Sequence, residues 1–415
     1  MSSWLECVTC HRHYPADEIR YTCDCGGLLS LERTEGWART IDRALFDSRR
    51  GATTPLDRSG VWRFREAVLD ADEAMIVCHP EGGTNLYQRS SLSDAVGLEQ
   101  LWFKHEGENP TGSFKDRGMT VAMTQARRLG AKAVACASTG NTSASLAAYA
   151  AQAGLRAIVF VPAGKVAVGK LAQTLAYGAT CLAVRGDFDA AMGLVSEAAA
   201  KLDIYLVNSI NPFRIEGQKT IVWELLQDLG WNAPDWIVLP AGNLGNTSAF
   251  GKALREAHEA GWIDRVPRLA AVQASGANPF FRSFEGGFEQ RYRIEAETVA
   301  TAIRIGNPVS HDKARAAIDY TRGLVTEVSD EELLEAKRAI DGAGIGCEPA
   351  SAVTYAAVRK LRANGTIRGE DRVVCVLTGN LLKDPDAIMR DEARIARQLI
   401  TIDPTLEAVE RAVKD

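Results

Sequence analysis

The 415-residue chain contains no long uncharged apolar run and no surplus of basic residues. A membrane-spanning helix needs roughly 18 such apolar residues, so none is expected. The opening residues MSSWLECVTC lack the basic and apolar blocks of a signal peptide, which predicts a cytoplasmic protein. The net charge of −5 argues against a nucleic-acid partner, because general binding needs a broad cationic surface.

The chain also lacks fixed-period repeats and any linker rich in Pro, Gly and Ser, so domains must be inferred from the order of predicted elements. From about residue 100, short β-branched runs such as RAIVFVP (156–162) alternate with helical segments that end at Gly154 and Gly178. A second series follows residue 210 and ends with RVVCVLTGN (372–380). This alternation predicts parallel sheets that helices cover on both faces.

We therefore expect an α/β protein with two doubly wound domains of largely parallel sheets and a small N-terminal cysteine-rich module. Residues 1–32 form the predicted module, which resembles a zinc ribbon in its cysteine spacing. Segments 45–105 and 212–400 form the large domain, and 106–211 form the small domain.

Three predicted strand–loop–helix turns are rich in small polar residues: ASTGNTSAS (137–145), LPAGNLGNTSAF (239–250) and VLTGN (376–380). Ligands of open parallel sheets bind where such turns gather, and the following helix offers free N–H groups to a phosphate. The chain has neither G-x-x-x-x-G-K-[ST] nor G-x-G-x-x-G, which disfavours nucleotides. A small phosphorylated ligand fits these turns better.

Lys115 lies between a turn and the start of a predicted helix, in HEGENPTGSFKDRGM (105–119). Most lysines are solvated surface residues, and that is the plain alternative here. A cation at a helix N-terminus opposes the helix dipole, however. Its placement indicates a covalent role for an amine with a depressed pKa.

These motifs together resemble those of the threonine synthases, which belong to the tryptophan-synthase-β-like, fold-type II group of pyridoxal-phosphate enzymes. The resemblance spans roughly residues 50–390. It rests on SGVWRF (59–64), ENPTGSFKDRG (108–118), ASTGNTSAS, NSINPFRIEGQKT (208–220), PAGNLGN (240–246), TAIRIGNPVS (301–310), EPASA (348–352) and LTGN followed by LLKD (377–384).

The resemblance implies a homodimer that converts O-phospho-L-homoserine and water to L-threonine and phosphate. It assigns the cofactor's Schiff base to Lys115, the 3′-oxygen to Asn141 and the pyridine nitrogen to Thr378. The backbone of Gly242, Asn243, Leu244, Gly245 and Asn246 would hold the cofactor phosphate. Ser138 and Thr139 would receive the substrate carboxylate or phosphate, and Lys165, Asn208, Ser209 and Arg214 would surround the substrate phosphate.

Two other functions stay open at this point. The chain could be another fold-type II enzyme that acts on serine, threonine or O-phosphoserine, such as a dehydratase or a cysteate synthase. It could also be a non-catalytic binding protein on the same fold. Asn85, where the family usually has proline, and His311, where an aromatic residue is common, both bear on substrate choice.

Four of the nine cysteines fall in the first 25 residues, as Cys7-x-x-Cys10 and Cys23-x-Cys25. Two such pairs can supply four thiolates to one tetrahedral zinc ion. The second spacing is tighter than the usual CxxC, and the similar segment of related threonine synthases can be a metal-free relic. A structural zinc and a metal-free module are therefore both open. The remaining cysteines are expected to be reduced: Cys78, Cys136, Cys181, Cys347 and Cys375.

Overall fold

The computed structural model describes residues 3–164, 171–186, 188–389, 395 and 398–414. The chain divides into two compact units, Met1–Lys383 and Asp384–Asp415. The second unit contains α16 (Asp386–Met389) and α18 (Leu406–Lys414). All features that follow lie in the first unit. No described helix is long and apolar enough to cross a membrane.

The N-terminal residues form a three-stranded antiparallel sheet in the order β2-β1-β3. Its strands are β1 (Ser3–Cys7), β2 (His13–Pro15) and β3 (Leu29–Arg33). Leu5 and Cys7 alternate with less buried residues along β1, and Leu29 and Leu31 do the same along β3. Because side chains alternate between the faces of a strand, one face of this small sheet joins the main core.

A six-stranded sheet has the order β12-β11-β10-β13-β5-β4, and only its edge strand β4 runs antiparallel to its neighbour. Its strands are β4 (Leu86–Tyr87), β5 (Gln100–His105), β10 (Trp236–Pro240), β11 (Arg268–Ala274), β12 (Leu324–Val328) and β13 (Arg372–Leu377). In β10, Ile237 and Leu239 belong to one hydrophobic core, while Trp236 and Val238 belong to another. The sheet is therefore buried on both faces, as the continuous apolar runs predict.

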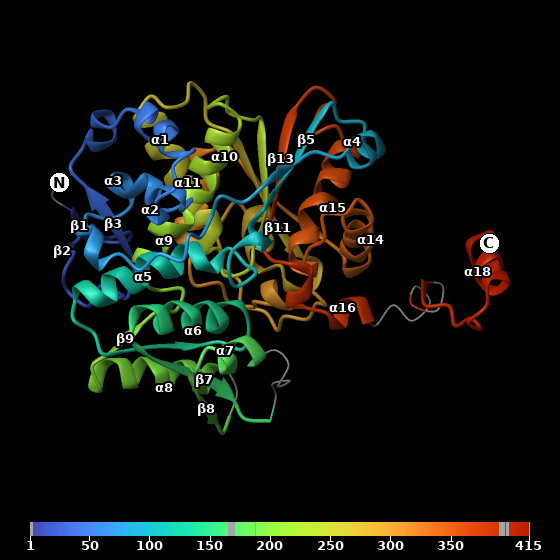
Figure 1. The fold of residues 1–415 in the computed structure, drawn as a ribbon. Helices are drawn as coiled ribbons and strands as arrows, with labels where there is room; N and C mark the ends of the chain where they lie inside the picture. The colour runs from blue at the N-terminus through green and yellow to red at the C-terminus, as the bar shows by residue number, and fades with distance from the viewer. Residues whose placement is uncertain (1–2, 165–170, 187, 390–394, 396–397, 415) are drawn as a thin grey trace. The chain divides into compact units, whose positions relative to one another are not determined.

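A four-stranded parallel sheet has the order β8-β7-β6-β9. Its strands are β6 (Ala133–Ala137), β7 (Arg156–Pro162), β8 (Thr180–Val184) and β9 (Ile204–Leu206). Val134 and Cys136 face the core that contains α5 and α6, whereas Ala135 and Ala137 face α8. Figure 1 shows α6 and α8 on opposite sides of this sheet. The predicted doubly wound α/β class is thus confirmed.

Helices connect the strands of both sheets. They are α1 (Arg43–Arg49), α2 (Pro55–Arg58), α3 (Arg65–Val68), α4 (Ser90–Val96), α5 (Lys115–Arg128), α6 (Asn141–Ala153), α7 (Ala172–Ala176), α8 (Phe188–Lys201), α9 (Phe213–Gln218), α10 (Thr220–Asp228), α11 (Gly245–Glu259), α12 (Pro279–Glu285), α13 (His311–Tyr320), α14 (Asp330–Gly342) and α15 (Pro349–Ala363). Strand β9 ends at Leu206, so Asn208 and Ser209 lie in the loop after it.

Candidate active site

The small polar turns all follow the carboxyl ends of parallel strands. Ser138 follows β6, the loop Gly242–Asn246 follows β10, and Thr378 follows β13. Ends of neighbouring parallel strands meet at one edge of a sheet, and this is where ligands of open α/β sheets bind.

The turn before Lys115 is joined to the loop after β13. Phe114 N donates to Thr378 O at 3.0 Å, and Asn380 N donates to Gly112 O at 2.9 Å. An isolated antiparallel bridge pairs Ser113 with Gly379. These contacts hold the start of α5 beside Thr378.

Asp116, the next residue along the chain, closes the same turn. Its carboxylate accepts hydrogen bonds from Thr111 N (2.7 Å), Thr111 Oγ1 (2.6 Å) and Ser145 Oγ (2.6 Å). Burial raises the pKa of Asp116 to about 6, although these bonds oppose that shift. Asp116 therefore ties the Lys115 turn to α6.

The amine of Lys115 lies 4.1 Å from the centre of the Phe114 ring. Among the described side chains, none accepts a hydrogen bond from it. Burial and the positive charge of Arg214 lower the pKa of Lys115 to about 7, and Glu348 opposes them. An amine with this pKa is largely neutral just above pH 7 and can act as a nucleophile or base.

Glu348 connects Asn141 and Thr378, the two residues that the family resemblance assigns to the 3′-oxygen and the nitrogen of the pyridoxal ring. Its carboxyl oxygens accept hydrogen bonds from Asn141 Nδ2 and Thr378 Oγ1, both at 3.1 Å. Burial raises the pKa of Glu348, which favours its neutral form, while Asn141, Thr378 and Lys115 oppose this. No role was predicted for Glu348 from the sequence, although the motif EPASA (348–352) begins with it.

Ser351, from the same motif, supports Thr378. Its hydroxyl accepts from Thr378 N at 2.8 Å and Gly379 N at 3.1 Å, and it lies 3.1 Å from Thr378 Oγ1. Because α15 carries this serine, the orientation of Thr378 depends on a helix of the large core.

The loop Gly242–Asn246 begins α11 and has the backbone form of an anion cradle. Leu244 adopts a left-handed conformation with φ 64°, which is rare outside glycine and is found at functional sites. A Cβ on Gly242 would lie 3.0 Å from Ile303 Cα, so this turn admits little beyond glycine. The first N–H groups of α11 have no acceptor within the helix.

Several polar atoms at the start of α11, on α9 and in the turn before Lys115 are buried and have no hydrogen-bond partner among the described residues. They are both side-chain atoms of the Asn246 amide, Thr247 Oγ1, Gln218 Oε1, Ser113 Oγ and Arg214 Nε. Buried polar groups almost always have a partner, so such a cluster marks a place where a polar ligand binds.

The residues predicted for the substrate phosphate differ in their surroundings. Asn208 exchanges two hydrogen bonds with the backbone of Ala137, at 3.0 and 3.1 Å, and so fastens the ends of β9 and β6 together. Ser209 Oγ accepts from Asn243 Nδ2 at 2.8 Å, which joins the phosphate loop to the small sheet.

Arg214 is buried, and its Nη1 donates to Val207 O at 3.0 Å. No carboxylate in the described part of the chain pairs with it. Burial lowers the pKa of Arg214 to about 10, and the guanidinium remains charged at neutral pH. An unpaired buried guanidinium attracts a phosphate strongly.

Ser138 and Thr139 are half-buried at the start of the turn before α6, where Gly140 N donates to Ser138 Oγ at 3.3 Å. Lys165 lies outside the described residues. Asn85 binds Glu108 through its backbone N–H at 2.7 Å, and His311 Nε2 lies 3.2 Å from Ser283 Oγ.

Pyridoxal phosphate fits three features of this site. They are the buried polar atoms without a partner, the Lys115 amine with its lowered pKa, and the loop before α11. Lys115 offers the amine for its carbonyl group, and the loop offers N–H groups for its phosphate. Asn141 and Thr378 offer an amide and a hydroxyl to the ring.

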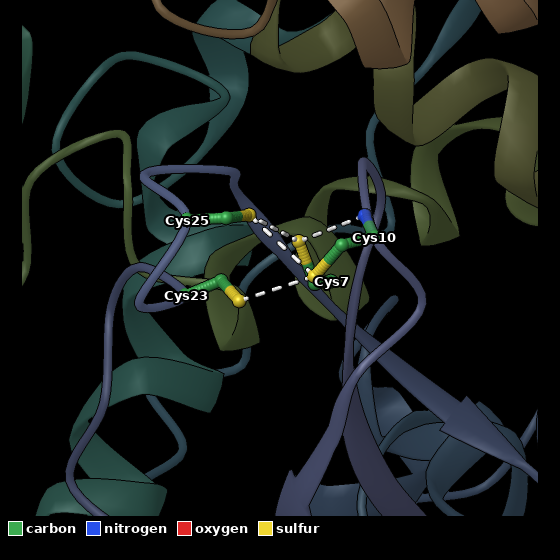
Figure 2. Close-up of side chains that lie close together, drawn as sticks. All are labelled: Cys7, Cys10, Cys23 and Cys25. Carbon is green, nitrogen blue, oxygen red and sulfur yellow. Dashed lines mark hydrogen bonds between the residues drawn. The ribbon is translucent and has the colours of Figure 1, made fainter.

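Four cysteine sulfurs form a separate cluster in the N-terminal sheet. Figure 2 shows Cys7, Cys10, Cys23 and Cys25 converging on one centre, and their Sγ atoms all lie within 4.8 Å of one another. Cys7 Sγ accepts from Thr9 N at 3.4 Å and Cys10 N at 3.5 Å. This group could hold a metal ion.

The family described as pyridoxal-phosphate dependent enzymes matches residues 77–379. The threonine synthase of Methanocaldococcus jannaschii is 45% identical over 411 residues, which are 99% of each chain. The chain belongs to the threonine synthase family. The threonine synthase of Methanosarcina acetivorans is 43% identical, with 99% of this chain and 98% of that protein covered. Threonine synthase 2 of Arabidopsis thaliana is 42% identical, with 89% and 74% covered.

Solved structures show the same fold. Threonine synthase from Escherichia coli matches with a TM-score of 0.70 at 19% identity, over 99% of this chain and 94% of that one. A threonine deaminase from Solanum lycopersicum matches with a TM-score of 0.66 at 19% identity, over 80% and 93%. The fold is thus shared by threonine synthases and deaminases, whereas the close relatives in sequence are threonine synthases.

Proposed function

We propose that this threonine synthase family member converts O-phospho-L-homoserine and water to L-threonine and phosphate. Two groups of the site carry the proposal. The amine of Lys115 has a pKa of about 7, and Arg214, whose charge acts on it, is a buried cation that no described carboxylate neutralises. One group suits proton transfer at carbon, and the other suits a phosphate on the substrate.

Pyridoxal phosphate stabilises the negative charge that develops on a substrate carbon after proton loss. Lys115 would hold its carbonyl carbon, and Asn141 and Thr378 would contact its ring. The backbone N–H groups of Gly242–Asn246 would bind its phosphate. Glu348 would fix Asn141 and Thr378 in place through the two hydrogen bonds that it accepts.

With the substrate bound, the Lys115 amine would remove the proton from Cα. Loss of a Cβ proton would then allow phosphate to leave from Cγ, and water would add at Cβ as Cγ gains a proton. A base with a pKa near 7 can both accept and return protons at neutral pH. Lys115 can therefore serve more than one of these steps.

Arg214 is proposed to bind the substrate phosphate with Ser209 and Lys165, while Ser138 and Thr139 receive the carboxylate or the phosphate end of the substrate. Asn208 contributes by joining β9 to β6, because its amide already bonds the Ala137 backbone. The site then places phosphate near one sheet and the reacting carbons near Lys115.

The test compares phosphate release from O-phosphohomoserine and O-phosphoserine. We expect threonine and phosphate in equal amounts from the first substrate and little phosphate from the second. Lys115→Ala should abolish turnover and the visible absorbance of the bound cofactor. Comparable turnover of O-phosphoserine, or an active Lys115→Ala variant, would overturn the proposal.

We also propose that the four clustered cysteines hold a structural zinc ion. Zn–S bonds of about 2.3 Å place the sulfurs of a tetrahedron about 3.8 Å apart. The Sγ–Sγ distances of 3.5 Å for Cys7–Cys25, Cys10–Cys23 and Cys10–Cys25 approach that value. We further propose that the protein is cytoplasmic, that it forms a homodimer and that its domains have the boundaries predicted from the sequence.

A further inference from the structure

Helix α9 lies against both the N-terminal sheet and the active site. On one side, Arg33 at the end of β3 donates from Nη1 to Glu216 Oε2 at 3.1 Å. Both side chains are buried, with 5% and 0% exposed. Lys252 strengthens this junction, because its amine binds Glu216 Oε1 at 2.7 Å and Ser30 Oγ at 3.3 Å.

Arg214 lies two positions before Glu216 and therefore faces away from it, as residues i and i+2 of a helix do. Its guanidinium donates to Val207 O on the small-sheet side. The same helix thus carries a contact with the N-terminal sheet on one face and the proposed phosphate ligand on another.

Helix α9 also packs without clearance on α5, the helix that begins at Lys115. A Cβ on Gly217 would lie 1.7 Å from Arg117 O, and a Cβ on Gly118 would lie 2.9 Å from Arg214 O. Because the two backbones are in direct contact, the position of Arg214 on α9 is set relative to α5, the helix that begins at Lys115.

Strand β3 connects the cysteine cluster to this junction. Its first residue, Leu29, pairs with Cys7, and its last residue, Arg33, binds Glu216. Gly27, just before β3, is so close that a Cβ there would lie 2.7 Å from Cys7 Sγ. The position of β3 therefore depends on how the four sulfurs are held.

A single ion explains the sulfur geometry better than two disulfides. Cys10 Sγ lies 3.5 Å from both Cys23 Sγ and Cys25 Sγ, and Cys25 Sγ also lies 3.5 Å from Cys7 Sγ. Cys10 and Cys25 thus each approach two other sulfurs, and all four Sγ atoms lie within 4.8 Å of one another, as ligands of one centre do. None of the four cysteines is in a disulfide. The backbone N–H groups of Thr9 and Cys10 donate to Cys7 Sγ, which is the kind of contact that orients a metal ligand from outside the coordination shell.

We propose that a metal ion on Cys7, Cys10, Cys23 and Cys25 positions Arg214 for the substrate phosphate, through β3, Arg33 and Glu216. Arg33 and Glu216 are positioning residues, since neither faces the reacting atoms. The proposal rests on the function proposed above. Metal loss weakens substrate binding and leaves the cofactor in place.

The first test measures zinc per chain and steady-state kinetics for the wild-type protein and the double variant Cys10→Ser/Cys25→Ser, which alters the two exposed ligands. We expect about one zinc per wild-type chain and none in the variant. The KM for O-phosphohomoserine should rise about 10-fold or more with a smaller change in kcat, while the cofactor absorbance stays unchanged.

The second test breaks the path and leaves the metal. Arg33→Met keeps Lys219 and Lys252 on Glu216, so the buried carboxylate retains cations. It should raise KM as the cysteine variant does, retain zinc and increase hydrogen exchange in residues 213–218. Arg33→Lys should restore part of the loss. Arg12→Ala, at an exposed ion pair of the same module, should leave KM, the zinc content and the exchange of residues 213–218 unchanged.

A wild-type protein that releases no phosphate from O-phosphohomoserine would refute the proposed function. The zinc and exchange measurements would still test whether the metal ion positions α9 through β3, Arg33 and Glu216. An active wild-type protein without zinc after zinc addition under reducing conditions overturns the inference. So does a zinc-free variant with unchanged KM and unchanged exchange at 213–218.

Discussion

Around Glu224, three buried cations pair with three carboxylates. At the active site, in contrast, Lys115 and Arg214 form no ion pair with any described carboxylate, and Glu348 is the carboxyl group whose charge acts on Lys115. The Glu224 cluster consists of Arg63, Lys104 and Arg117 with Glu106, Glu224 and Asp228. The cluster at the N-terminal sheet is also balanced, with Arg33, Lys219 and Lys252 against Glu32, Glu216 and Glu256.

The pKa values follow this difference. Burial would raise the pKa of Glu224, but Arg117, Lys104 and Arg63 hold it well below its usual range. At the active site, burial instead lowers the pKa of Lys115 and raises that of Glu348. The paired clusters stabilise the fold, and the unbalanced site is suited to anions that arrive from outside.

The largest expected effect is the loss of a balanced cluster. Glu224→Gln leaves Arg117, Lys104 and Arg63 without their shared carboxylate. Removal of one partner of a buried ion pair costs about 3–5 kcal/mol, so we expect a loss of that order in urea unfolding. The matched control Glu197→Gln, at an exposed pair with Lys201, should change stability by about 0.5 kcal/mol or less.

The same variant predicts a pH effect. Because the folded pKa of Glu224 is depressed, its contribution is fully present above about pH 4.3 and is lost as the pH falls further. Glu224→Gln should therefore lose less stability between about pH 5 and pH 3 than the wild-type protein. Equal losses would show that this cluster is not the acid-labile element.

Arg214→Met, unlike Glu224→Gln, should not lower the stability of the protein. It removes a buried cation that no described carboxylate neutralises, so the free energy of unfolding should stay constant or rise. The KM for O-phosphohomoserine should rise about 10- to 100-fold, because a hydrogen bond to a charged group contributes about 1.5–3 kcal/mol. A destabilisation as large as that of Glu224→Gln would remove the contrast between the two regions.

The sequence alone predicted features that depend on neighbouring residues. Strand β10, the glycine-rich loop and α11 follow each other directly, so their local pattern was sufficient. The start of α5 at Lys115 was predictable for the same reason, and so was the cysteine cluster, whose four members fall within 19 residues, 7–25. The strands β4 and β5 were not predicted individually. Strand β4 has only two residues, too few for a strand pattern in the sequence.

Contacts between distant residues were beyond sequence reasoning. The hydrogen bond from Asn141 to Glu348 joins residues 207 positions apart in the sequence, and that from Arg33 to Glu216 joins residues 183 positions apart. The motif EPASA marked Glu348 as a family feature, but periodicity and spacing cannot say which buried group a carboxyl will meet. Only the fold brings such partners together, and it is these contacts that set the charge balance of each region.

The charge balance at Lys115 can be measured directly in the wild-type protein. Only the neutral amine can attack the cofactor carbonyl, and the pKa of Lys115 is lowered to about 7. The rate at which cofactor-free protein binds pyridoxal phosphate should therefore rise with pH around a midpoint near 7, followed by absorbance. An ordinary lysine would give a midpoint near about 10.4, and that result would contradict the burial of this amine.

The smallest expected effects are shifts of this midpoint in opposite directions. Arg214 lowers the pKa of Lys115 and Glu348 raises it, with Arg214 the stronger of the two. Arg214→Met should thus move the midpoint up, and Glu348→Gln, which keeps a side chain of the same shape, should move it down by a smaller amount. If both variants shifted the midpoint the same way, a general loosening of the site would explain the change. Opposite shifts would instead show that the charges of Arg214 and Glu348 act directly on the pKa of Lys115 in an otherwise intact site.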